Sequence, residues 1–119
     1  MMNMSVHAVL NTKKIKQRAQ KSFGRAQFVM DSQVLNDSND YIPADDWNLR
    51  DSSLTHSNLG EGDIKWRTPY GRKLYYNPQF NFSTDKNPQA QGLWFEAAKS
   101  KDKDSWITQS KKEFEANFN

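Results

Sequence analysis

Cysteine is absent from this chain of 119 residues. Its absence excludes disulfide cross-links, thiol catalysis and zinc sites of the cysteine type. Long apolar runs are also missing, since no stretch approaches the roughly 20 apolar residues that a membrane-spanning helix needs. The first ten residues have neither the charged start nor the apolar centre of a signal peptide. We therefore expect a soluble, unprocessed protein that does not enter a membrane.

Apolar residues are scarce as a class: they make up 35% of the chain, and the mean hydropathy is −0.99. The chain nevertheless contains 4 Trp, 4 Tyr and 7 Phe residues. A length of 119 residues is enough for one domain with a modest core, and we treat residues 1–119 as a single domain. The surplus of aromatic residues predicts aromatic surface that is buried against partners.

Signatures of catalysis are missing as well. The sequence contains no Gly-x-Ser-x-Gly elbow, no phosphate-binding loop and no dinucleotide fingerprint. His7 and His56 are far apart, and the aspartates of residues 37–46 lack the spacing of a calcium loop. We predict no catalytic residue, no metal site and no cofactor, and therefore no enzyme. Carboxylates that converge only in the folded chain leave a small hydrolase as an open alternative.

Charge is unevenly distributed along the chain. Residues 1–30 contain six basic residues and no acidic one, whereas residues 31–51 contain six aspartates against Arg50. A basic block next to an acidic one is typical of nucleic-acid binding, of pairing between copies in a ring, or of two solvated faces. The candidate charge-pairing residues are Lys13, Lys14, Arg18, Arg25, Asp40, Asp45 and Asp46.

The most regular pattern is an apolar stripe with steps of three and four residues, which predicts an amphipathic helix over residues 12–38. The stripe consists of Ile15, Ala19, Phe23, Ala26, Met30 and Val34. Residues 1–11 are expected to be extended, with a short edge strand at residues 5–10.

Alternation of Ile64 and Trp66 with charged neighbours predicts a strand with one buried face. A first strand is expected from residue 49 to 57, and the glycines of residues 58–62 predict the turn between them. The predicted β-hairpin covers residues 49–68, with residues 51–58 paired to 62–68.

Residues 69–76 are predicted to form a short helix and residues 77–86 a loop. Asn87-Pro88 has the pattern of a helix start, and residues 87–117 are predicted to be helical, in two helices separated near residue 101. The fold class expected is therefore α+β, with the long N-terminal helix packed on a small antiparallel sheet and followed by C-terminal helices.

Four segments in this order resemble the small minor capsid or head–tail connector proteins of long-tailed bacteriophages. They are residues 21–27 with 33–39, residues 41–53, residues 64–72 with 75–76, and residues 86–90 with 94–100 and Trp106. The second is similar to the family's proline-x-aspartate-threonine-glycine-x-leucine segment, with Asp46-Trp47 in place of threonine-glycine. Since glycine permits a positive φ, this departure implies a different turn and a contact by Trp47 that is special to this virus.

The resemblance implies a structural virion protein at the head–tail junction, present in the host cytoplasm during assembly. It implies a ring of six or twelve copies that contacts the portal or adaptor on one side and the tail terminator or tail tube on the other. DNA is expected to pass through the lumen without specific binding. The candidate interface residues are Trp47, Trp66, Tyr70, Tyr75, Tyr76, Phe80 and Phe82. The alternative function is a small nucleic-acid-binding domain that uses the basic N-terminal helix.

Overall fold

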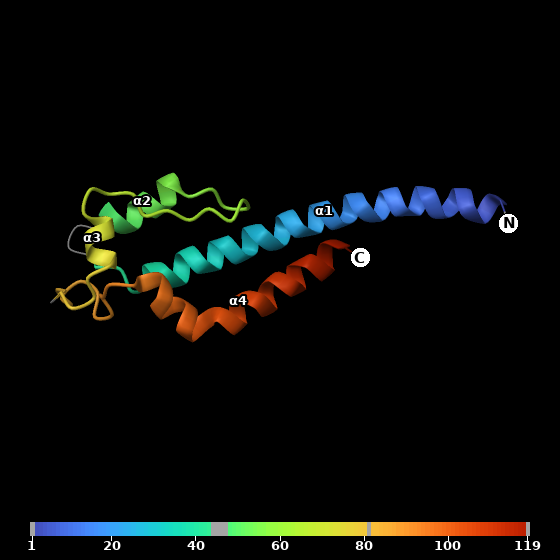
Figure 1. The fold of residues 1–119 in the computed structure, drawn as a ribbon. Helices are drawn as coiled ribbons and strands as arrows, with labels where there is room; N and C mark the ends of the chain where they lie inside the picture. The colour runs from blue at the N-terminus through green and yellow to red at the C-terminus, as the bar shows by residue number, and fades with distance from the viewer. Residues whose placement is uncertain (1, 44–47, 81, 119) are drawn as a thin grey trace.

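Four helices follow one another along the chain. The computed structural model describes residues 2–43, 48–80 and 82–118, with side chains from residue 13 onward. The helices are α1 (Met2–Asn39), α2 (Asn48–His56), α3 (Gly71–Tyr75) and α4 (Trp94–Phe118). α4 lies along the C-terminal half of α1 and runs antiparallel to it (Figure 1). The N-terminal half of α1 extends beyond the other elements, and the molecule measures 72 × 25 × 19 Å.

α1 is long because no helix-breaking residue interrupts it. The first proline of the chain is Pro43, and Gly24 is the only glycine before it. At 1.5 Å per residue, the 38 residues of α1 span about 57 Å. The predicted helix of residues 12–38 lies within α1. Residues 2–11, which were predicted to be extended, form its first turns instead.

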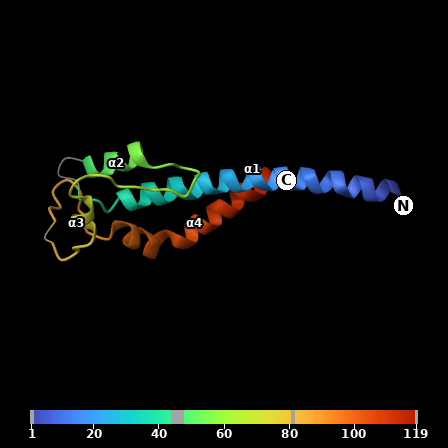
Figure 2. The same cartoon turned by 45° about the horizontal axis from the view of Figure 1, so that its top comes forward.

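The predicted α+β fold with a β-hairpin core is wrong. The described residues contain no strand. Among them, a single isolated antiparallel bridge pairs Asn58 with Asp63. The residues predicted as the first strand form α2. Its buried residues Leu49, Ser52 and Ser53 are three and four positions apart, which places them on one face of a helix. Figure 2 shows α2 and α4 on opposite sides of α1.

The segment predicted as the second strand is extended, but its partner is a helix. The backbone N–H of Lys65 donates to Ser57 Oγ at 2.9 Å, and that of Arg67 donates to Ser52 Oγ at 2.9 Å. Ser52 Oγ in turn donates to the carbonyl of Leu49 at 2.6 Å. Serine hydroxyls in α2 and just after it therefore replace the carbonyls that a neighbouring strand would provide.

The glycine turn predicted at residues 58–62 is present, and it docks on α1. Gly60 and Gly62 have φ of 99° and 71°, the left-handed region that glycine enters without a steric penalty. Both backbone N–H groups donate to Asp31 Oδ2 at 2.8 Å. Gln27 Nε2 donates to the other carboxylate oxygen at 2.7 Å, and Asp31 is only 3% exposed. A buried carboxylate thus fastens the turn to the C-terminal half of α1.

The C-terminal region forms one helix instead of two. α4 begins at Trp94, so residues 87–93 are not helical, and it continues through the charged residues near position 101. Asn87 ties this connection to the end of α1, because its Nδ2 donates to the carbonyls of Asp40 and Ile42 at 2.9 and 2.8 Å. Gln91 N–H also donates to the carbonyl of Tyr41 at 2.9 Å.

The core lies at the C-terminal end of α1 and consists of two small clusters. Val34, Ala98 and Trp106 form the first, between α1 and α4. Ile42, Leu49 and Trp94 form the second, where α2 and α4 begin. Over the described residues, none of the helices combines the length and apolar character required to cross a membrane. The thin core agrees with the low apolar content of the sequence.

Replacing Asp31 by alanine is expected to lower the free energy of unfolding by about 1–3 kcal/mol, because two part-buried glycine N–H groups and the Gln27 amide lose their acceptor. Urea denaturation would measure the change. Asp51→Ala is the matched control, since Asp51 is exposed and its ion pair with Arg50 lies within one helix. That variant should change stability by no more than about 0.5 kcal/mol. Equal losses for both variants would contradict the role of Asp31.

Candidate assembly surface

Aromatic side chains gather at the end of the molecule where α3 lies, around the indole of Trp94. This indole is 1% exposed. Its ring meets Trp66 edge-on at 6.0 Å between centroids and Tyr75 edge-on at 4.7 Å. Such edge-to-face contacts add to the stabilisation from burial. Trp94 lies within residues 87–117, which were predicted only to be helical, so its central place was not predicted.

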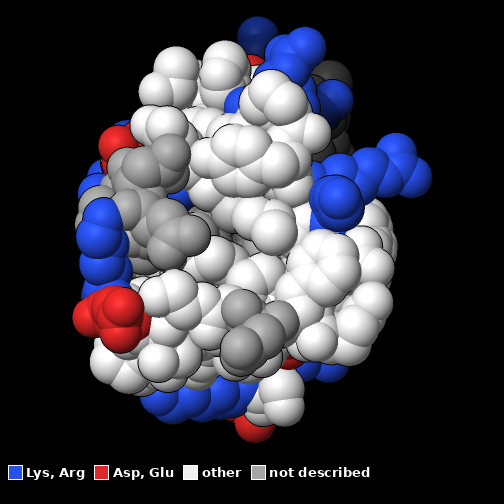
Figure 3. Space-filling model, turned by 90° about the vertical axis from the view of Figure 1, so that its left-hand side faces the viewer, with Lys and Arg blue, Asp and Glu red and all other residues white. Residues whose placement is uncertain are grey.

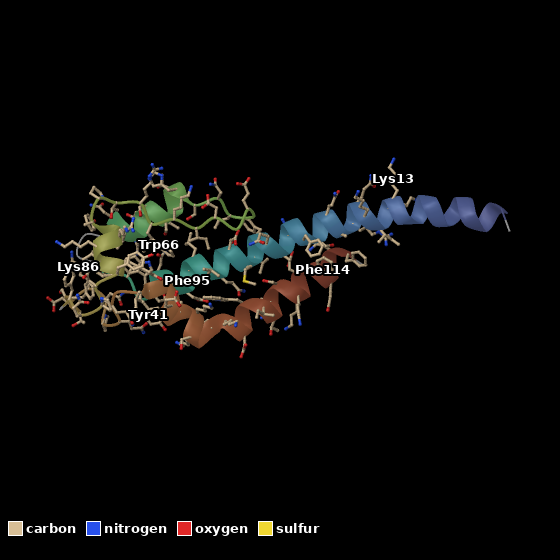
Figure 4. The ribbon with its side chains drawn as sticks, viewed as in Figure 1. Lys13, Tyr41, Trp66, Lys86, Phe95 and Phe114 are labelled. Carbon is tan, nitrogen blue, oxygen red and sulfur yellow. The ribbon has the colours of Figure 1, made fainter. Side chains whose placement is uncertain are left out.

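Trp66 is held in place by a polar relay from the end of α1. Its Nε1 donates to Asn39 Oδ1 at 2.8 Å, and Asn39 Nδ2 donates to Ser53 Oγ at 3.0 Å. The relay joins the last residue of α1 to α2 and to the extended segment. Figure 4 shows Trp66 beside the C-terminal end of α1, near Phe95 and Tyr41. Asn39 directly follows the helix predicted over residues 12–38, and its contacts with residues far along the chain have no signal in the sequence.

A cleft of about 640 Å³ opens between this cluster and α1. Its lining consists of Val34, Gly62, Ile64, Trp66, Gly71, Arg72, Tyr75, Tyr76, Trp94 and Phe95. Arg72 is the only charged residue among them, and its guanidinium lies 5.8 Å from the ring centre of Tyr76. The indole N–H of Trp94 has no acceptor among the described residues. The cleft therefore fits apolar side chains accompanied by a carbonyl or carboxylate oxygen.

Three of the predicted interface residues line this cleft. Trp66 and Tyr75 are half-buried, and Tyr76 is 65% exposed. Burial raises the pKa of Tyr75, and the negative charge of Glu96 raises it further. The phenol is therefore neutral near pH 7, as an apolar contact surface requires.

Tyr70, Phe80 and Phe82 lie outside the lining of the cleft. Tyr70 is 38% and Phe80 37% exposed, and the rings of Phe80 and Phe82 meet at 6.3 Å. Figure 3 views the α3 end of the molecule, where uncharged side chains cover the middle and most charges lie at the rim. Residues 74–95 contain only Asp85 and Lys86 as charged residues. Few charges and many aromatics are typical of the centre of a protein interface.

Three of the predicted residues, Trp47, Asp45 and Asp46, lie outside the described residues.

The predicted charge-pairing residues are not brought together within one chain. Lys13, Lys14 and Arg18 are exposed on the protruding half of α1, where Figure 4 labels Lys13. Asp40 follows the other end of α1, about 40 Å from Lys13 at 1.5 Å per residue. Arg25 instead contacts Glu113 of α4 at 3.6 Å. Pairing of the two blocks between copies stays a prediction.

No group of three or more His, Asp or Glu side chains that could hold a metal occurs among the residues the structure describes. The lining of the cleft contains no carboxylate and no imidazole. What the cleft offers is therefore apolar contact surface and one cation, Arg72.

A family model for minor capsid proteins matches residues 6–114 of the chain. No curated protein and no solved structure matches the chain significantly. The resemblance to minor capsid proteins that was predicted from the four segments is confirmed by this match.

Gly92→Ala is expected to destabilise the protein by about 1–3 kcal/mol, since a methyl group there overpacks the wall behind the cleft. The new Cβ would lie 2.8 Å from the carbonyl oxygen of Leu74 and 3.0 Å from Pro78 Cα, which are backbone atoms. Gly24→Ala is the control, because no atom lies within 4 Å of its Cβ position. It should stabilise α1 by about 1 kcal/mol. Urea unfolding would measure the free energy of unfolding of both variants. Equal changes in the two variants would refute the prediction.

Tyr75 should make the stability depend on pH in the alkaline range. Its pKa is raised from 10.0 in the folded chain, so the unfolded chain ionises first. The stabilisation from the neutral phenol is complete below pH 10 and is lost as the pH rises through the folded pKa. Tyr75→Phe should show a shallower decline of unfolding free energy above pH 10 than the unaltered chain. Identical slopes in denaturant titrations would contradict this.

Proposed function

Because the chain belongs to the minor capsid protein family, we propose that it is a structural protein of the neck of a long-tailed bacteriophage. In this role, copies of the chain form a ring that joins the capsid to the tail. The observation that supports this proposal most strongly is the aromatic end of the molecule. Its aromatic side chains remain exposed in a single chain and are therefore available for contact with another protein. As a minor capsid protein, the chain has a structural role in the virion.

The exposed aromatic rings at this end favour contact with another protein. Tyr76, Tyr70 and Phe80 are 65%, 38% and 37% exposed, although aromatic residues gain most from burial. Permanent interfaces between proteins bury about 2,000 Å² or more, and such a contact would cover these exposed rings. We infer that the aromatic end docks on a neighbouring virion protein.

The chemistry of the cleft defines what the neighbour presents. Apolar side chains would fill the space beside Tyr75 and Tyr76, and a backbone carbonyl or carboxylate would accept from Arg72. A segment of the portal or adaptor on the capsid side, or of the tail terminator or tail tube on the other, would supply both. The ring would contain six or twelve copies, with DNA passing through its lumen without specific binding.

A second candidate function, nucleic-acid binding, is favoured by the exposed cations of α1. Lys14, Arg18 and Lys21 follow one another at spacings of four and three residues, which forms a row along one side of the helix. Such a row can contact phosphates. Aromatic rings can stack on bases, but the aromatic end lies at the opposite end of the molecule from these cations (Figure 1), so we rank this function second.

Phage that lack the gene should yield filled heads and separate tails, because the neck is incomplete. Complementation with Tyr76→Ala should restore fewer joined particles than the unaltered gene, since the variant loses an exposed aromatic contact. Leu54→Ala, which removes a side chain that is 62% exposed on α2, is the matched control and should restore joining. Electron microscopy of the lysates would count the joined particles. Intact infectious virions from phage without the gene would overturn the proposal.

A further inference from the structure

The protruding half of α1 carries charge of one sign only. Residues 1–30 contain six basic residues and no acidic one. Five of the six lie within residues 13–21 and are exposed, namely Lys13, Lys14, Lys16, Arg18 and Lys21. Within the described part of the chain none of these five forms an ion pair, whereas Arg25 contacts Glu113. The segment thus presents five positive charges that the rest of the chain leaves unneutralised.

This charge pattern differs from that of an ordinary solvated helix face, which mixes both signs. The other long helix, α4, does so, with three lysines and two aspartates within residues 99–104. In α1, Lys14 lies four residues before Arg18 and Arg18 three before Lys21, spacings at which like charges destabilise a helix. No carboxylate of residues 1–30 offsets the repulsion. An external polyanion would therefore stabilise this cationic row of Lys14, Arg18 and Lys21.

The cationic row lies on a different side of α1 from α4. At 3.6 residues per turn, its three members fall within an arc of about 60°. Ile15 and Ala19 lie roughly 110° further round the helix, and they continue the apolar stripe whose Phe23 meets Phe114 of α4 at 4.8 Å. Figure 4 also shows Lys13 on the side of α1 that points away from α4. A ligand on the cations therefore does not displace α4.

The helix has no neighbour where the cationic row begins. α4 ends at Phe118, four residues after Phe114, and α1 continues alone beyond this point (Figures 1 and 2). An α-helix with its side chains is about 10–12 Å wide, and the major groove of B-DNA is about 12 Å wide. The protruding segment can therefore lie along or within the groove of a duplex without a clash from the body of the molecule.

We propose that the protruding half of α1 binds double-stranded DNA through its phosphates, without regard to sequence. Lys14, Arg18 and Lys21 contact the phosphates, and Lys13 and Lys16 add to the attraction. The inference goes beyond the proposed neck role, since it gives the single chain a second surface, for DNA, and does not require a ring. The length of α1 separates this surface from the aromatic end, so DNA binding accompanies protein contact there and does not replace it.

Two observations favour duplex DNA over an acidic protein or a single strand. Protein interfaces are depleted of lysine, whereas DNA-binding surfaces are strongly positive, and four of the five exposed cations are lysines. Single strands are held by stacking on aromatic rings, but residues 1–22 contain no Phe, Tyr or Trp. Phosphate contacts require only cations, which is what this segment offers.

Fluorescence anisotropy of short labelled DNA duplexes, titrated with the full chain, tests the inference. Two duplexes of unrelated sequence should bind equally well. The logarithm of the association constant should fall with the logarithm of the salt concentration, with a slope of about −0.9 for each phosphate contact. A chain with Lys14→Gln, Arg18→Gln and Lys21→Gln should have a slope shallower by about 2–3, and should bind roughly ten-fold or more weakly at about 50 mM salt.

The matched control carries Lys99→Gln, Lys101→Gln and Lys103→Gln, which remove the same three positive charges from α4. Its slope should change by less than about 0.5, because these lysines lie among aspartates and away from the protruding segment. All six substituted positions are exposed, so both variants keep the fold.

Several results would overturn the inference. No binding of duplex DNA by the unaltered chain at low salt would remove it, and equal losses in the two triple variants would show an effect of net charge alone. A ten-fold preference for one duplex would indicate readout of bases, and tighter binding of a single strand would assign the segment to that ligand. Competition by polyglutamate as effective as by DNA of equal charge would assign it to an acidic protein. The neck role stands apart from these results, because counts of joined particles test it separately.

Discussion

The fold depends on polar side chains in the C-terminal half of α1, which anchor the glycine turn, α2, the extended segment at Trp66 and α4. Asp31 accepts from the glycine turn, Asn39 accepts from Trp66, and Asp37 accepts from Trp106 Nε1 at 2.7 Å. These contacts join residues that lie 27 to 69 positions apart in the chain. With a core of two small clusters, hydrophobic burial alone would leave the connections loosely held. A single helix therefore acts as the frame of the molecule.

This frame divides the molecule into two ends with different chemistry. At one end, the anchored loops place Trp66, Tyr75 and Trp94 around a cleft that remains open. At the other, α1 continues past its partner helix with cations and uncovered apolar residues. In the proposed ring, each chain would contact both its own copies and different neighbours. Two chemically distinct ends allow these contacts to form without competition for one surface.

Sequence patterns identified some features because they depend on local chemistry. The apolar stripe from Ile15 to Val34 predicted helix, and the glycines at 60 and 62 predicted a turn. The prediction of a hairpin failed at residues 49–57, where two leucines among polar residues fit a strand as well as a helix. Leu49, Ser52 and Ser53 have the spacing of one helix face. A sequence pattern does not reveal this face, because serines are not expected to be buried, and the structure shows that these two are. Short segments of mixed polarity have no decisive period.

From the sequence alone came the long helix, its basic start, the aromatic surplus and the membership of the minor capsid family, since each depends on residue type and order. Only the tertiary structure decided that α2 takes the place of a strand, that Asp31 and Asn39 are anchors, and that Trp94 lies at the centre of the cleft. The physical reason is that a buried hydrogen bond pairs groups that are distant in the chain. Neither partner has a local pattern that reveals the other, so only folding brings them into contact.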